Sequence, residues 1–97
     1  MNLFEYKTPL TGEKFTTLFE HKNIKIVRIV SSNTFKSEEY CQEEDEWVVL
    51  LEGEATLYLN EERKVLKKGE SLFIPALTKH HISSMQQGTL WLTLHIF

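Results

Sequence analysis

The sequence predicts an all-β domain, a sandwich or small antiparallel barrel of about seven to nine short strands with no substantial helix. Turn residues recur at close spacing along the chain. The segments between them are short and rich in β-branched and aromatic residues, which favour strands. No stretch shows the apolar period of a helix of useful length. At 97 residues, we expect one domain spanning residues 1–97.

Composition and charge exclude several classes of partner. The net charge is −3 and the eleven lysines and arginines are scattered, so no nucleic-acid partner is expected. No stretch approaches the ~18 apolar residues of a membrane span, so no membrane partner is expected. The single cysteine, Cys41, cannot form an internal disulfide, and the first residues lack a signal core. These features predict a cytoplasmic protein.

The expected elements follow from the alternation of apolar segments and turn residues. Residues 1–14 mix residue types without a period and are expected to form an irregular lead-in, with a short strand at residues 3–6. The polar run 31–45 is expected to be a loop. The other strands are expected at residues 15–20, 24–30, 46–59 (two strands), 64–66, 71–74, 78–83 and 89–97.

The most apolar stretch, residues 46–59, organises the rest of the chain. Glu46 stands at its front edge, and Gly53 interrupts it at the expected corner between two strands. Alternation places Glu46 and Val48 on one face and Trp47 on the other. Both faces are apolar beyond Glu46, so both need a cover. The candidates are the barrel interior for one face and the partner sheet's rim, the N-terminal segment or a second subunit for the other.

Two spaced motifs resemble those of the cupins. Glu46 and Gly53, with six residues between them, resemble the end of the first cupin motif, and Gly69, Pro75 and His80 resemble the second. Further local matches to small single-domain bacterial cupins of the conserved-barrel type lie at Asp45–Val48, Gly53–Ala55, Ile74–Ala76 and Trp91–Leu92 with His95. The resemblance covers roughly residues 30–97 and implies an antiparallel jelly roll whose interior often holds a divalent metal.

The sequence departs from the family pattern at the expected metal site. The family's first motif carries two histidines separated by one residue. The corresponding positions are Tyr40 and Gln42, or Glu39 and Cys41 in an alignment shifted by one. Leu77 replaces the glycine after the proline of the second motif. The family's set of three histidines and one glutamate therefore cannot be present.

The expected metal ligands are His80, His95 and Glu46, with Gln42 as an optional fourth. His80 matches the second motif, and the alternative is an exposed loop histidine; strand alternation places His81 outside. His95 lies inside a hydrophobic strand and needs a metal or a hydrogen-bond partner, so a hydrogen-bonded core histidine is equally expected. The alternative for Glu46 is one more acid in a solvated run.

These residues predict a small cupin that binds a divalent metal, iron, manganese, zinc or nickel, beside an unidentified small molecule. Family analogy adds an enzyme of the oxygenase or isomerase class. The alternative is a metal-free ligand-binding or sensor module, with Tyr58, Phe73 and Trp91 lining an apolar pocket and Tyr40 at its mouth. In that case Glu46 and His95 would orient a polar ligand. A third hypothesis is a non-catalytic structural unit, and we expect a homodimer.

Overall fold

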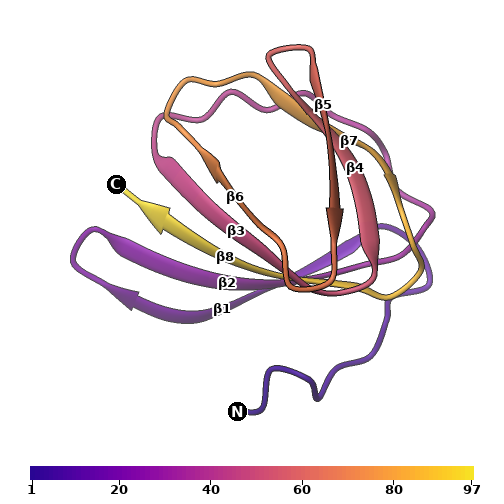
Figure 1. Ribbon diagram of the computed structural model, residues 1–97. Coiled ribbons are helices and arrows are strands. Elements are labelled where there is room, and N and C mark those ends of the chain that lie inside the picture. Colours follow the sequence, from indigo (N-terminus) through magenta and orange to yellow (C-terminus); the bar gives the residue numbers. More distant parts are fainter.

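The structure, a computed structural model, describes residues 1–97 and consists of two antiparallel sheets that face each other (Figure 1). One sheet has five strands in the order β1-β2-β8-β3-β6, and the other has three in the order β5-β4-β7. The strands are β1 (Glu13–His21), β2 (Ile24–Ser31), β3 (Asp45–Glu52), β4 (Glu54–Leu59), β5 (Glu62–Lys67), β6 (Ser71–Ile74), β7 (His80–Met85) and β8 (Thr89–Ile96). This confirms the all-β prediction. No helix of the kind that crosses a membrane is present.

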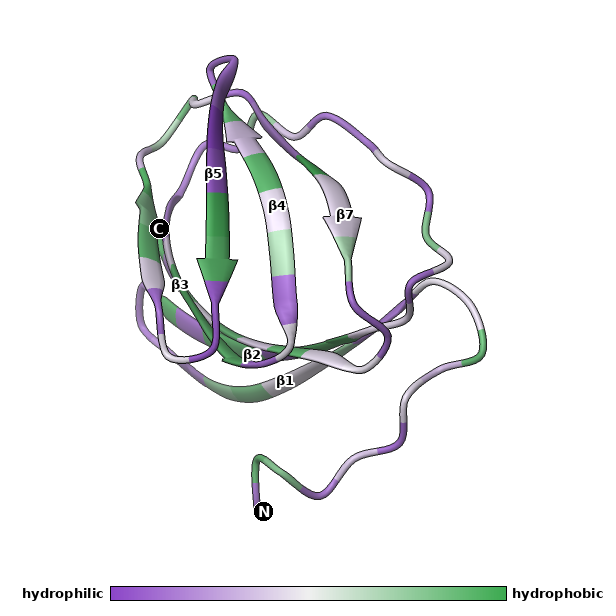
Figure 2. Cartoon of the chain, turned by 45° about the vertical axis from the view of Figure 1, so that its right-hand side comes forward, coloured by the Kyte–Doolittle hydropathy of each residue, from purple (hydrophilic) through white to green (hydrophobic).

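The N-terminal segment differs from its prediction, because no strand forms at residues 3–6. The Nη1 of the buried Arg28 lies 3.1 to 3.5 Å from the carbonyl oxygens of Asn2, Leu3 and Glu5. These carbonyls therefore meet a guanidinium instead of the amides of a neighbouring strand. Figure 2 shows the segment running away from the sheet before it joins β1.

Gly53 forms the corner at which the chain leaves the five-stranded sheet and enters the three-stranded one. Its φ is +93°, and a Cβ added there would lie 2.6 Å from the Oγ1 of Thr89. Only glycine meets both conditions, because it has no Cβ and tolerates positive φ. The corner therefore lets β3 and β4 pack on opposite sides of one core.

The register of the large sheet arranges the residues of its inner face in rows. Three successive rows cross β2, β8 and β3: Lys25–His95–Glu46, Val27–Thr93–Val48 and Ile29–Trp91–Leu50. The first row is charged or polar and the third is apolar. Polarity therefore falls from the first row to the third, and the following row, Glu13–Ser31–Thr89, is polar again.

The hydrophobic core lies between the two sheets at the apolar end. Alternate residues of β3 and β4 contribute to it, and the banded colours of β4 in Figure 2 show the alternation. Full burial of one large apolar side chain stabilises the folded state by about 1.5–3 kcal/mol. Its buried members are Val48, Leu50, Ala55, Leu57, Leu66, Ile74, Met85 and Trp91.

The outer face of the large sheet carries a second apolar row. The residues that are paired across all five strands, which we call the outer row, are Phe73, Trp47, Leu94, Ile26 and Phe19. Phe73, Trp47 and Phe19 are 50%, 39% and 53% exposed. The prediction that both faces of the Trp47 strand are apolar is confirmed, and the N-terminal segment covers only the part near Arg28.

Candidate ligand-binding site

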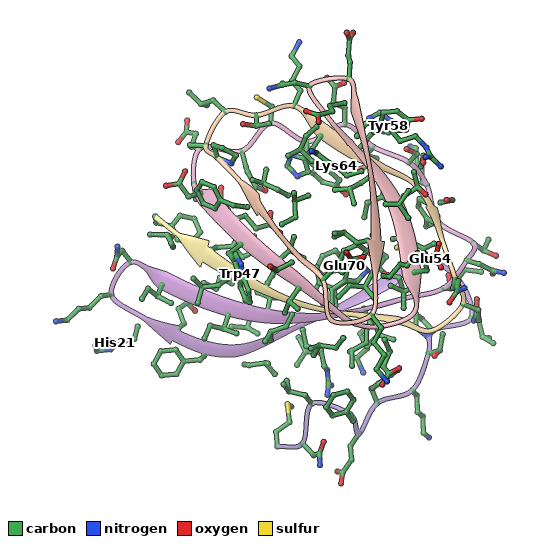
Figure 3. The ribbon with its side chains drawn as sticks, in the orientation of Figure 1. His21, Trp47, Glu54, Tyr58, Lys64 and Glu70 are labelled. Atoms are coloured by element: carbon green, nitrogen blue, oxygen red, sulfur yellow. The ribbon has the colours of Figure 1, made fainter.

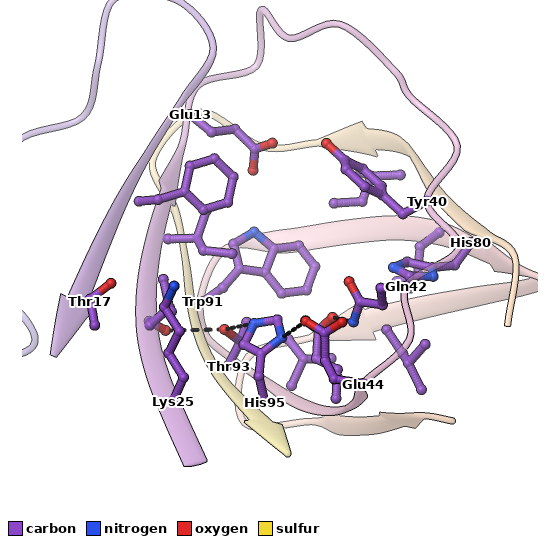
Figure 4. Close-up of a pocket in the computed structure, with 18 of the residues that line it drawn as sticks. Glu13, Thr17, Lys25, Tyr40, Gln42, Glu44, His80, Trp91, Thr93 and His95 are labelled. Carbon is purple, nitrogen blue, oxygen red and sulfur yellow. Dashed lines mark hydrogen bonds and ion pairs between the residues drawn. The ribbon is translucent and has the colours of Figure 1, made fainter. Parts of the chain in front are cut away.

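A pocket of about 420 Å³ opens between the two sheets above the core (Figure 4). Val48, Leu57, Ile74 and Trp91 belong to both the core and the pocket, so the core forms the pocket floor. The volume lies in the range of small-molecule sites in proteins. The rigid floor and the polar first row of the sheet meet in this one cavity.

One wall of the pocket is the segment that leads into β3. Tyr40, Gln42, Glu44 and Glu46 all line the cavity. The segment is extended, so alternate side chains point to opposite sides; Cys41, for example, is exposed. The positions where the cupin motif carries histidines therefore do face the interior, with a phenol and an amide in their place.

His80 presents a free ring nitrogen to the pocket. Its Nδ1 lies 2.9 Å from the carbonyl oxygen of Thr78, which can only accept, so Nδ1 carries the proton. In the neutral ring Nε2 is then an acceptor, and it has no partner in the chain. Tyr40 stacks on the imidazole with ring centroids 5.7 Å apart, and two backbone hydrogen bonds join the same residues. His80 is 8% exposed.

Glu46 is held from one side only. The Nε2 of Gln42 donates a hydrogen bond of 2.7 Å to its Oε1. This is the only hydrogen bond to the carboxylate, and the side chain is 8% exposed. A buried carboxylate needs more than one neutral donor to replace its hydration. The second oxygen is therefore open to a ligand.

His95 has no free ring nitrogen. Its Nδ1 lies 3.1 Å from the Oε2 of Glu44, and its Nε2 lies 3.1 Å from the Oγ1 of Thr93. Figure 4 draws both interactions, together with the 3.4 Å hydrogen bond from Thr93 to the carbonyl oxygen of Val27. His95 is therefore a hydrogen-bonded histidine of the barrel interior, which is one of the two roles expected from the sequence.

The residues present do not fit the expected metal site. No group of three or more histidine, cysteine, aspartate or glutamate side chains is placed to hold an ion. His95 uses both ring nitrogens, and Gln42 turns its amide nitrogen toward Glu46. Two donors remain, the Nε2 of His80 and one oxygen of Glu46, and a protein metal centre uses three or four protein ligands.

Two of the expected pocket residues lie elsewhere. Trp91 and Tyr40 line the cavity, but Tyr58 and Phe73 do not. Strand alternation turns Tyr58 to the outer face of β4, where it stacks on His81 at 5.1 Å; Figure 3 shows it near the end of the strand. Phe73 pairs with Trp47 on the outer face of the large sheet. In both strands the neighbouring aliphatic residue faces inward.

Several pocket residues were not predicted from the sequence. Glu44, Lys25 and Thr93 belong to the polar end, and Glu13 and Phe15 come from β1. For Glu44 a signal existed, because it shares the alternation of Gln42 and Glu46. For the β1 residues, the sequence gives no indication that this edge strand reaches the cavity.

Nearby carboxylates, one of them outside the pocket, also act on Tyr40. Burial raises the pKa of its hydroxyl, and the carboxylates of Glu38 and Glu13 raise it further. Tyr40 is therefore a neutral hydrogen-bond donor at the pocket rim at physiological pH. The Nε1–H of Trp91 is a second donor, buried and without a partner in the chain.

Comparison with known proteins assigns the family. The model of the cupin domain (Cupin_2) matches residues 27–96, and the chain belongs to this family. No curated protein sequence matches the chain significantly.

Several solved structures superpose closely on the chain. A candidate mannose-6-phosphate isomerase from Ralstonia eutropha JMP134 is 28% identical with a TM-score of 0.87, over 99% of this chain and 95% of that one. An RmlC-like cupin from Shewanella frigidimarina NCIMB 400 is 20% identical (TM-score 0.80, 96% and 86% covered). KdgF from Halomonas sp. is 16% identical (TM-score 0.81, 88% and 78% covered). The last two likenesses show the fold.

Proposed function

We propose that this cupin binds a small organic molecule in the pocket between its two sheets without a resident metal ion. The observation that carries the proposal is the combination of a preformed cavity with two buried groups, His80 and Glu46, that each keep an unused acceptor atom. Both atoms open onto the cavity, where a bound ligand would replace water as their hydrogen-bond partner.

Tryptophan fluorescence tests the proposal. The chain has two tryptophans, of which Trp91 lines the pocket and Trp47 lies on the outer face. In Trp47→Phe the emission reports on the pocket alone, and in Trp91→Phe it reports on the outside. We expect saturable changes with members of a panel of amines, sugars and hydroxy acids in Trp47→Phe but not in Trp91→Phe. Equal responses of the two variants would argue against the site.

The same titration in EDTA separates this proposal from the metal-dependent one. Binding that persists in the chelator supports a metal-free pocket. The metal-dependent alternative retains only the free donors of His80 and Glu46, so we expect Zn²⁺, Mn²⁺, Ni²⁺ and Fe²⁺ to bind weakly. Stoichiometric uptake that is lost in both His80→Ala and Glu46→Gln would revive the metal centre.

A second candidate function is proton transfer within the bound molecule, as an isomerase requires. The free Nε2 of His80 favours it, because a neutral imidazole held in one tautomer can accept a proton from a ligand. The similarity to the candidate isomerase from Ralstonia eutropha fits this class. Exchange of carbon-bound hydrogen into a bound ligand in D₂O, absent in His80→Gln, is the expected signature; binding without exchange would leave a binding module.

A further inference from the structure

The charge of the pocket lining is strongly unbalanced. Its ionisable groups are three glutamates, two histidines, one lysine and one tyrosine, without an arginine. Glu46 is hydrogen-bonded by the neutral Gln42, and Glu13 by the hydroxyl of Ser31 at 2.7 Å. The one lysine, Lys25, forms an ion pair with neither. Glu44 lies 3.1 Å from the Nδ1 of His95, and the other two carboxylates form no ion pair, so the concave site keeps an excess of negative charge that acts on a ligand.

The unused polar atoms at the polar end of the pocket are acceptors. The Nε2 of His80 and the second oxygen of Glu46 belong to side chains that are each 8% exposed, and the remaining exposure includes these two atoms, which open onto the cavity. Both line the cavity, and Figure 4 shows the imidazole of His80 at the wall beside Gln42. Acceptors of this kind require a ligand that brings N–H or O–H groups.

The apolar part of the lining favours a cation over a neutral donor. The aromatic rings of Phe15, Tyr40, Trp91 and Phe97 line the same cavity. Aromatic faces attract ammonium groups, and the attraction grows when the site excludes water. The hydroxyl of Tyr40 gives a second indication of negative charge near the pocket. The carboxylates of Glu38 and Glu13 add to burial in raising its pKa.

From the carboxylates, the buried acceptors and the aromatic walls, we infer that the ligand is an organic ammonium ion, an amine with a small apolar or aromatic body. The inference rests on the proposed function of the pocket as a ligand site. At the polar end a phosphate would meet Glu44 and Glu46, with Lys25 and the two histidines but no arginine, so the lining disfavours phosphorylated and carboxylate ligands there.

Three probes of matched size test the inference: 2-phenylethylamine, 2-phenylethanol and phenylacetate. Each is titrated into Trp47→Phe, with the emission of Trp91 as the readout. We expect the amine to bind at least about tenfold more tightly than the alcohol, as loss of a charge-assisted hydrogen bond would predict. We expect no saturable binding of phenylacetate. Added salt should reduce the preference for the amine.

Two glutamine variants in the Trp47→Phe background locate the charge that selects the amine. Glu46→Gln should lower the affinity for the amine about tenfold and leave the alcohol nearly unchanged. Glu43→Gln makes the same chemical change at a neighbouring exposed position outside the pocket and should retain the full preference. A cooperative thermal unfolding transition verifies that each variant is folded. Glu44→Gln gives a second test of the charge at the polar end of the pocket.

The possible results separate the inference from the function on which it rests. Binding of the alcohol or of phenylacetate as tightly as the amine overturns the ammonium ligand and leaves the pocket as a ligand site. A preference for the amine that survives Glu46→Gln and Glu44→Gln also overturns it. If no probe changes the emission of Trp91, both the inference and the binding function of the pocket lose their support.

Discussion

His95 shows how one residue decides between two chemistries of the same barrel. Its side chain has the position of a candidate metal ligand on the inner face of β8, but Glu44 and Thr93 occupy both ring nitrogens. Glu44 comes from the acidic run before β3, where a solvated charge was expected. The hydrogen-bond partners of the ring, and not its position, remove it from metal chemistry.

Tyr40 gives a prediction about alkaline pH. Burial, then Glu38 and Glu13, raise the pKa of its hydroxyl above 10.0. The folded state therefore holds this proton more tightly than the unfolded state. The stabilisation is present below the unfolded pKa and is lost as the pH rises through the folded pKa. Between about pH 9 and 11, wild-type protein should lose more stability in urea unfolding than Tyr40→Phe. Equal losses would contradict the pKa shift.

Arg28 gives a prediction about the N-terminal segment. It is 7% exposed, its Nη1 serves three backbone carbonyls, and its Nε has no partner. Loss of the guanidinium leaves three part-buried carbonyl groups without this donor. Arg28→Met should therefore lower the free energy of unfolding by about 1–3 kcal/mol while the barrel stays folded. It should also speed chymotrypsin cleavage after Phe4 and Tyr6. Unchanged cleavage would show that the segment is held by other contacts.

At the scale of the elements, the corner between β3 and β4 depends on Gly53. Gly69 has a similar φ of +86° but open space around its Cβ position. A substitution at Gly69 therefore measures the cost of backbone strain alone, and one at Gly53 adds the cost of the contact with Thr89. Gly69→Ala should cost roughly 1–2 kcal/mol, the penalty of a left-handed backbone. Gly53→Ala should cost clearly more, because its Cβ would also meet Thr89. Similar unfolding free energies for the two variants would show that Thr89 moves away without cost.

Strand alternation explains which parts of the site could be predicted. It placed Glu46, His95 and Trp91 on inner faces and His81 outside, because a period of two needs only local sequence. Tyr58 and Phe73 were assigned to the interior by residue type, and the same alternation turns them outward. Glu44 follows the same alternation as Gln42 and Glu46 and could have been assigned in this way. Glu13 escaped prediction because its position depends on the packing of an edge strand, and such non-local packing leaves no periodic signal.

At the scale of the whole molecule, the outer row remains without a cover. It crosses all five strands of the large sheet, and its three aromatic residues are more than a third exposed. Rows of large exposed apolar residues typically mark association surfaces. The expectation of a homodimer from the sequence therefore stays a prediction, now with a definite face.

Light scattering coupled to size-exclusion chromatography tests the homodimer. We expect a dimer at micromolar concentration for wild-type protein and a monomer for Trp47→Lys, because two ammonium groups would be buried without partners. Leu10→Lys is the control, since Leu10 is 95% exposed in the N-terminal segment. A wild-type monomer, or a dimer that persists in Trp47→Lys, would rule out the outer row as the interface.

The alternation of the segment from Tyr40 to Glu46 bears on how the pocket could evolve. Two sets of side chains are interleaved along one extended backbone, and only Tyr40, Gln42, Glu44 and Glu46 reach the cavity. Deletion of one residue just before β3, such as Glu43, would shift the preceding residues by one position and bring Cys41 to the inside in place of Tyr40 and Gln42, while Glu46 stays fixed in β3. A single codon event could thus exchange part of the polar wall while the core stays intact. In this barrel, ligand chemistry can change in one step.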